Sequence, residues 1–169
     1  FNDFRTPQGS VEIRGKPAGN RGRKDQAVWQ MSSAAALYNA EVLGLAVSLA
    51  EYPLADDLPL RGQARAPLCG SSIALGLALD QHGRIARIGL KAHACAIGQA
   101  AAALFAASAQ GKNRVGIVNA LDEIETWLSA ENSPLPDWAG FGIIAAARAY
   151  PARHGAILLS WKAALAALP

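Results

Sequence analysis

The chain is poor in cysteine and in charge. It has two cysteines in 169 residues, 17% of its residues are charged and 51% are hydrophobic. A composition this apolar excludes a disordered chain, and two distant thiols without a CxxC pair exclude a disulfide framework. Apolar runs of the roughly 20 residues that a membrane helix needs are absent, as is an apolar leader at the N-terminus. We therefore expect a cytoplasmic protein without a membrane segment.

Several functional motifs are also missing. Neither a G-x-S-x-G nucleophile motif nor a phosphate-binding glycine motif occurs, which argues against a hydrolase or a nucleotide-binding protein. The net charge of +3 lies entirely in residues 1–30, where six Lys and Arg face three acidic residues, while residues 31–169 balance at ten against ten. A folded nucleic-acid-binding face would be basic, so we expect no nucleic acid partner.

The N-terminal region differs from the rest of the chain. Residues 1–30 are rich in glycine and scattered charge, which predicts a disordered basic extension, followed by a single domain over residues 31–169. Met31 is the only methionine and stands at this boundary. It suggests a natural start, with residues 1–30 an upstream extension or a remnant of cloning.

Periodicity predicts an α+β domain. Asn39 is a predicted N-cap for a helix through Ala50. The pattern of residues 61–67 is typical of an edge strand. In residues 73–79 every second residue is Ile or Leu, which predicts a half-buried strand. Residues 85–94 are predicted to form a third strand with Lys91 and His93 on one face. Helices are predicted over 96–109, 114–130, 141–150 and 154–168. Three strands followed mainly by helices indicate a small three-stranded antiparallel sheet packed against about five helices.

Both cysteines lie at junctions between these elements. Cys69 sits in Pro67-Leu-Cys-Gly-Ser-Ser72, between the first two strands, and Cys95 ends the third strand where a helix opens. A helix N-terminus stabilises a thiolate, the form that binds metal or attacks sulfur. His93 points the same way as Cys95 along the strand, and His154 is predicted to open the last helix. By spacing alone, the pattern is weak and also fits two unconnected core cysteines and a satisfied histidine.

Four segments resemble, in order, the iron–sulfur cluster assembly scaffolds of the IscU/SufU/NifU N-terminal type. They are Leu37-Tyr38, Pro67-Leu-Cys-Gly70, the Lys91–Ala101 stretch with Cys95-Ala-Ile-Gly98, and Pro151-Ala-Arg153 with Ser160-Trp-Lys-Ala-Ala-Leu165. The long interval between Cys95 and Pro151 resembles the SufU-like branch. The resemblance covers about four-fifths of the chain and implies a SufE/NifU-like fold.

The resemblance also implies ligand positions, and two of them differ here. The family pattern has an aspartate where this chain has Ser71, and a third cysteine where it has Ala156. Two thiolates are too few, because zinc and each iron of a cluster take four ligands. His93 and His154 could complete the set with Cys69 and Cys95, two chains could share one cluster in a homodimer, or the site could be inactive.

The resemblance implies a function as well. We expect a non-enzymatic iron–sulfur assembly scaffold or sulfur carrier that binds iron, zinc or a cluster transiently through Cys69 and Cys95. Cys95 is the expected sulfur acceptor. The implied partners are a cysteine desulfurase and recipient apoproteins. The alternative is a degenerate scaffold that acts as a metal-free interaction module for a cysteine desulfurase.

Overall fold

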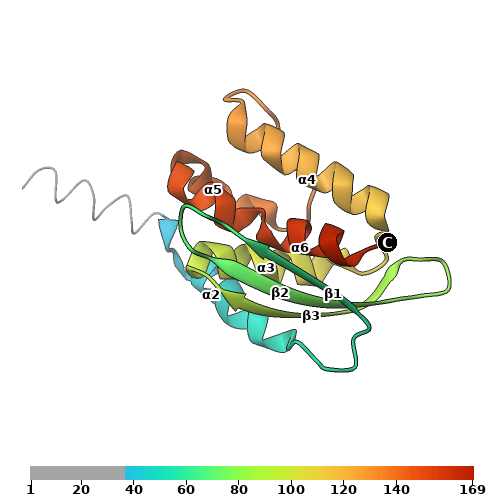
Figure 1. The fold of residues 1–169 in the computed structure, drawn as a ribbon. Helices are drawn as coiled ribbons and strands as arrows, with labels where there is room; N and C mark the ends of the chain where they lie inside the picture. Colours follow the sequence, from blue (N-terminus) through green and yellow to red (C-terminus); the bar gives the residue numbers. More distant parts are fainter. Residues whose placement is uncertain (1–36) are drawn as a thin grey trace, which may run out of the picture.

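The computed structural model describes residues 37–169 (Figure 1), so the predicted extension and Met31 lie outside the described residues. The first helix, α2 (Ala40–Ser48), begins where the sequence predicts. The side chain of Asn39 caps it by accepting a hydrogen bond of 2.9 Å from the backbone N–H of Val42. The predicted last turn is instead a 3-10 turn, η1 (Leu49–Glu51), and the chain leaves it before Pro53.

Three antiparallel strands form one sheet in the order β1-β2-β3. They are β1 (Leu60–Arg65), β2 (Ser72–Leu79) and β3 (Ile85–His93). Ile73, Leu75 and Leu77 of β2 are buried on one face as predicted, whereas Leu79 is only partly buried and Gly76 on the other face is buried as well. β1 ends two residues before Pro67, because the backbone N–H of Ala66 bonds the Ser71 carbonyl at 2.8 Å and closes the turn there.

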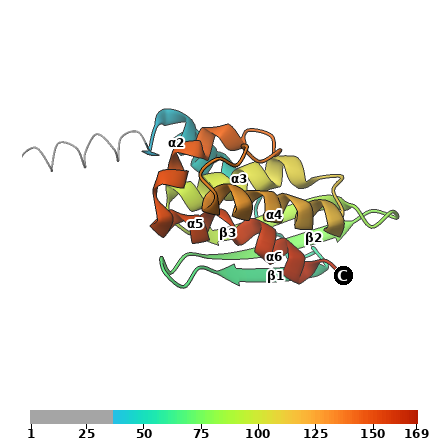
Figure 2. The ribbon, with the colours of Figure 1, turned by 90° about the horizontal axis from the view of Figure 1, so that it is seen from above.

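The helices cover one face of this sheet (Figures 1 and 2). α3 (Ala96–Ala109) and α6 (Leu159–Ala167) pack against the strands, α2 lies beside α3, and α4 (Arg114–Ser129) lies beside α6. The α+β class is confirmed, and residues 37–169 form five α-helices, in line with the expected number. None of the helices in residues 37–169 is long and apolar enough to cross a membrane.

Two helix predictions near the C-terminus were wrong. The segment expected as one helix from His154 to Leu168 forms two helices, α5 (Pro151–Ile157) and α6, separated at Leu158. α5 begins at Pro151, because a proline at the first helical position lacks only an N–H that would have no partner there. The segment Phe141–Ala149, expected to be α-helical, is the 3-10 helix η2.

An aromatic cluster fills the core between α3, η2 and α6. Trp161 packs edge-on against Phe105 and Trp138, with ring centroids 5.2 Å apart in both pairs. The indole N–H of Trp138 donates to the Leu104 carbonyl at 2.9 Å, so its burial leaves that donor satisfied. These contacts fix the C-terminal helices over α3.

The contact between α6 and β1 depends on a residue without a side chain. A Cβ atom at Gly62 would collide with the backbone oxygen of Ala163 and would lie 2.9 Å from the nitrogen of Ala167. Backbone atoms cannot move aside as a flexible side chain can. The position therefore requires glycine for α6 to lie on the sheet.

We expect Gly62→Ala to lower the free energy of unfolding by about 1–3 kcal/mol or more, because it overpacks the α6–β1 contact. The matched control is Gly44→Ala in α2, where nothing lies within 4 Å of an added Cβ. That change should raise stability by about 0.5–1 kcal/mol, since alanine loses less backbone entropy in a helix. Urea denaturation of both variants checks the pair. Equal stability of the two variants would contradict the close α6–β1 packing.

Candidate thiol site

The loop that carries Cys69 is a tight turn between β1 and β2. Gly70 adopts a left-handed conformation, with φ of 69°, and its N–H bonds the carbonyl of Ala66 at 3.0 Å. This turn leaves Cys69 half-buried and directs its Sγ to the hydroxyl of Ser71, to which it donates at 3.2 Å. Ser71 is only 5% exposed, so the thiol has a fixed polar neighbour.

The surroundings of Cys69 favour its thiolate. The Ser71 hydroxyl, which can donate to the deprotonated sulfur, is the main cause that lowers the pKa of Cys69 below that of an ordinary thiol. Burial raises this pKa, while the backbone N–H groups of Ser71 and Cys69 and the positive charge of Arg153 lower it further. A larger fraction of Cys69 is therefore thiolate at a given pH. Thiolate is the form of cysteine that attacks sulfur and binds metal.

Cys95 occupies the predicted junction between β3 and α3. It is the N-cap residue of α3, with an extended backbone (φ −65°, ψ 168°), and its side chain makes no capping hydrogen bond. Its carbonyl accepts from the N–H of Gln99 at 2.9 Å, which starts the helix. The Gln99 side chain donates to the carbonyl of Ala94 at 2.9 Å. The thiol of Cys95 is thus half-buried and not engaged in holding the helix end.

The two cysteines and His93 line one hollow of about 340 Å³. His93 is the last residue of β3 and pairs with Ser72 at the start of β2, so the antiparallel register brings the two cysteine segments together. Ser71 and Gln99 also line this hollow. The structure therefore gathers three of the four predicted site residues around one space.

His154 is not among them. Its Nε2 lies 2.8 Å from the carbonyl oxygen of Arg148, and its ring lines a different hollow, beside Pro151 and Glu131. Within residues 37–169, no group of three His, Cys, Asp or Glu side chains is arranged to hold a metal ion. Ligation by Cys69, Cys95, His93 and His154 together stays a prediction. In this structure α5 holds His154 away from the other three residues.

Of the two positions implied as lost ligands, one contacts a thiol and the other packs against α3. Ser71 bonds Cys69 directly, and Ala156, which is fully buried in α5, packs on the first turn of α3. A Cβ atom added at Gly98, three residues after Cys95, would lie 3.2 Å from the Cβ of Ala156. α5 thus places Ala156 against the first turn of α3, and the charge of its Arg153 acts on Cys69.

Sequence reasoning missed two contributors to the site. Ser71 was considered only as the replacement of an aspartate, yet its hydroxyl is the partner of Cys69. Its position two residues after a cysteine, beyond a turn glycine, is the local signal that could have indicated this contact. Arg153 acts on Cys69 from a segment more than eighty residues away, which no local pattern reveals.

The site therefore has two half-buried thiols, one with a lowered pKa, at the junction of a small sheet and a helical layer. No family model and no curated protein matches the chain. Solved structures do match the chain, and their folds can be compared with it.

The chain is similar to the N-terminal part of a nitrogen-fixing NifU-like protein from Brucella abortus, with 24% identity and a TM-score of 0.71, covering 80% of this chain and 94% of that one. It is also similar to a protein of Fervidobacterium islandicum AW-1 assigned as an iron–sulfur cluster assembly scaffold of the SUF system. There the identity is 18% and the TM-score 0.70, with 80% of this chain and 98% of that one covered. A hypothetical protein matches at 20% identity and a TM-score of 0.62, over 78% of this chain and 98% of that chain. The chain thus has the NifU-like and SufU fold, which confirms the resemblance at the level of fold.

Replacing Ser71 tests the electrostatics of the site. We expect Ser71→Ala to raise the pKa of Cys69, because the hydroxyl that stabilises the thiolate is lost, and so to slow its alkylation near neutral pH. One hydrogen bond to a charged group corresponds to about 1.5–3 kcal/mol at most, and partial exposure reduces it, so a change of about threefold to tenfold is expected.

Iodoacetamide labelling followed by peptide mapping, from pH 6 to 10, measures this at each cysteine. In the wild type, labelling of Cys69 should rise at lower pH than in the variant, because only the thiolate reacts. Cys95 in the same molecule is the internal control, since Ser71 does not bond it. An unchanged profile for Cys69 would contradict the role given to Ser71.

Proposed function

We propose that this chain is a SufU-like iron–sulfur assembly protein of the cytoplasm, which binds iron, zinc or a cluster transiently through Cys69 and Cys95. The observation that supports this most is the meeting of the two thiols and His93 around one hollow. Thiolate and imidazole are the ligands that zinc and iron–sulfur clusters take from proteins. The metal or cluster is cargo that is passed on, so the protein is not an enzyme.

The proposed site is incomplete within one chain. Cys69, Cys95 and His93 line one hollow but are not arranged to hold a metal as they stand, and even together they would supply three ligands where four are needed. A second chain in a homodimer, or a partner protein bound at the hollow, supplies the remainder. Such an open site suits transient cargo, because the partner that completes the coordination also removes the metal or cluster. His154 contributes only after α5 moves, since its ring now lies 2.8 Å from the carbonyl of Arg148.

Sulfur transfer is the other proposed activity, with a cysteine desulfurase as the donor. A thiolate of this chain attacks the outer sulfur of the donor's persulfide, and the donor cysteine leaves as its thiolate. Cys95, at the N-terminus of α3, is the proposed acceptor from its position. The lowered pKa of Cys69 supports that residue as a second acceptor in the same hollow. Recipient apoproteins then take the sulfur or the assembled cluster.

Anaerobic reconstitution with ferrous iron and sulfide tests the cargo site. We expect wild-type protein to show a visible sulfur-to-iron charge-transfer band, and Cys69→Ser and Cys95→Ser each to lose most of it, because each removes one of two thiolates. His82→Ala, in the exposed β2–β3 turn, is the control and should keep the band. If neither a cysteine-dependent band nor stoichiometric zinc is found, the metal-free interaction module is favoured.

Restoring the implied ligands gives a gain of function. We expect Ser71→Asp combined with Ala156→Cys to bind about one zinc per chain and to hold it at least tenfold more tightly than the wild type, because the set becomes three thiolates and one carboxylate. Competition with a chromogenic zinc chelator measures the affinity. The matched control is Ser71→Asp with Ala163→Cys, which places the new thiol in α6. Equal affinity of the two double variants would argue against Ala156 as a ligand position.

A further inference from the structure

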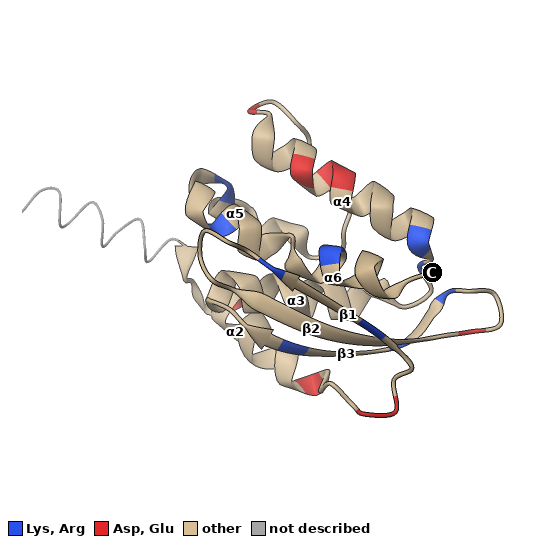
Figure 3. Ribbon diagram, viewed as in Figure 1, with Lys and Arg blue, Asp and Glu red and all other residues tan. Residues whose placement is uncertain are grey.

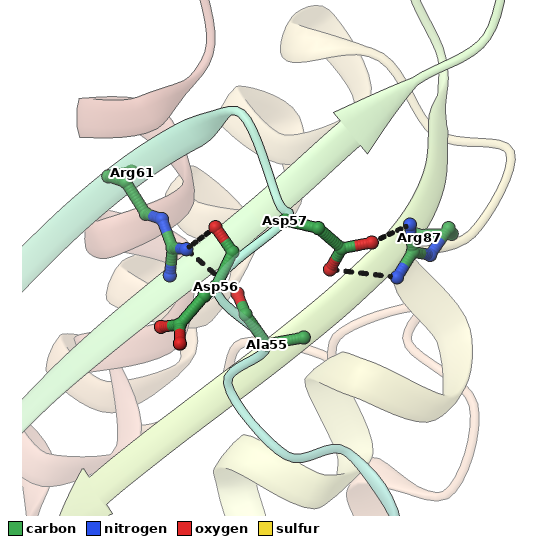
Figure 4. A network of polar contacts seen from close by, with 5 residues as sticks. All are labelled: Ala55, Asp56, Asp57, Arg61 and Arg87. Carbon is green, nitrogen blue, oxygen red and sulfur yellow. Dashed lines mark hydrogen bonds and ion pairs between the residues drawn. The ribbon is translucent and has the colours of Figure 1, made fainter.

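Most cations in the described part of the chain are engaged by other groups. Figure 4 shows the guanidinium of Arg61 on the carbonyls of Ala55 and Asp56, and that of Arg87 on the carboxylate of Asp57. The others have carbonyl, carboxylate or aromatic partners: Arg84, Lys112, Arg114, Arg148 and Lys162. Three cations therefore stand out by having no such partner within residues 37–169.

These three are Arg65, Lys91 and Arg153, and all of them lie near the thiol site. Arg153 acts on Cys69 through its charge. The side chains of Arg65 and Lys91 make no hydrogen bond or ion pair with any other group in residues 37–169, although their backbones belong to the sheet. Both are exposed, at the ends of β1 and β3 that lead into the cysteine segments. Cations left unpaired at one place are available to an external anion.

The register puts Arg65 and Lys91 on the same face of the sheet. Arg65 is opposite Ser72, which is opposite His93, and Lys91 is opposite Ala74, which is opposite Gln63. Directly opposed residues, and residues two apart on a strand, share a face. Ile73 lies between Ser72 and Ala74 in β2, so its side chain points to the opposite face, where it is buried beneath the helices. Arg65 and Lys91 are therefore on the face turned away from α3 and α6.

A groove of about 460 Å³ follows this face and reaches the thiol hollow. Arg65, Lys91 and Ser72 line it, and His93 lines both the groove and the hollow that holds Cys69 and Cys95. No acidic residue lines either space, and none of the three strands contains Asp or Glu. Figure 3 shows this sheet with basic positions on β1 and β3 and with the acidic positions elsewhere.

The other end of the same face is already covered. Cβ atoms added at Gly76 and Gly89 would lie 2.9–3.0 Å from Leu58 and Leu54, so the segment before β1 lies on the sheet there. Among residues 37–169, no segment covers the end beside the cysteines, where Arg65 and Lys91 are exposed. The open surface, its unpaired cations and the thiol hollow therefore form one continuous region.

We propose that this groove binds an extended acidic segment of a partner protein that exchanges cargo at the thiols. Arg65 and Lys91 are separated by two strand spacings and two residues, about 12 Å between backbones, which matches carboxylates three to four residues apart in an extended chain. Opposite charges at such a surface steer association and select partners. This inference rests on the proposed function, since it places the partner's segment beside Cys69 and Cys95.

The probe for this groove is a fluorescein-labelled decaglutamate peptide, with binding followed by fluorescence anisotropy in low salt, where screening is weak. We expect Arg65→Gln/Lys91→Gln to weaken binding about fivefold to tenfold. The control Arg84→Gln/Lys162→Gln removes the same charge at the β2–β3 turn and on α6, and should weaken it less than twofold. No binding by the wild type, or equal losses in both double variants, would overturn the proposal.

Carbodiimide crosslinking locates the peptide on the full chain, which has five lysines, Lys16, Lys24, Lys91, Lys112 and Lys162. We expect the peptide carboxylates to couple mainly to Lys91. Coupling confined to Lys16 and Lys24 would place the peptide on the N-terminal segment and overturn the groove. An oligothymidylate that competes at Lys91 and binds more tightly than the peptide would overturn the choice of a protein segment.

The same variants separate this inference from the proposed function. Arg65→Gln/Lys91→Gln keeps both thiols, so its iron–sulfur charge-transfer band should match that of the wild type. A wild type that binds the peptide through Arg65 and Lys91 but never forms the band would sink the cargo function while leaving the acidic-segment groove in place. Loss of the band in this double variant, with circular dichroism unchanged, would instead show that these cations act on the cargo site and overturn their assignment to docking.

Discussion

Burial of α3 on nearly all sides is the constraint on which the rest of the structure depends. Ten of its fourteen residues are buried, and most of these are alanines. Small side chains let neighbouring elements approach α3, which packs on α2, β3 and α5. The close approach of α5 is seen at Gly98, where an added Cβ would lie 3.2 Å from the Cβ of Ala156. Because α3 is packed on most of its surface, its position fixes that of its N-cap residue Cys95 at the end of β3.

Cys69 is held by a different means, and the two thiols therefore have different properties. Its position comes from backbone hydrogen bonds within a turn and from the hydroxyl of Ser71, not from the packing of a helix. The preceding residue, Leu68, is 93% exposed, so the loop presents this thiol at the surface. Both thiols are half-buried, but Cys95 begins a helix that is held in the core, whereas Cys69 lies on a surface turn.

The two faces of the sheet have different surroundings. One face packs on α3 and α6 and supplies the core, with Gly62 allowing the close approach of α6. Within the part of the chain that the structure describes, Leu54 and Leu58 cover one end of the other face, and its open end carries Arg65 and Lys91. Since His93 borders both this open end and the thiol hollow, recognition of a partner and exchange of cargo are proposed to occur side by side.

The sequence by itself determined the features that depend on neighbouring residues. The cap of Asn39, the alternation of β2, the bounds of α3 and the place of Cys95 at a strand–helix junction were all predictable, because capping and periodicity are local. The break between α5 and α6 at Leu158 was not predictable from local pattern, because α5 packs on α3 while α6 packs on β1 and β2. Only the tertiary structure decided which distant residues meet. The register of Ser72 with His93 brought the two thiols to one hollow, while the position of α5 placed His154 elsewhere and Arg153 near Cys69.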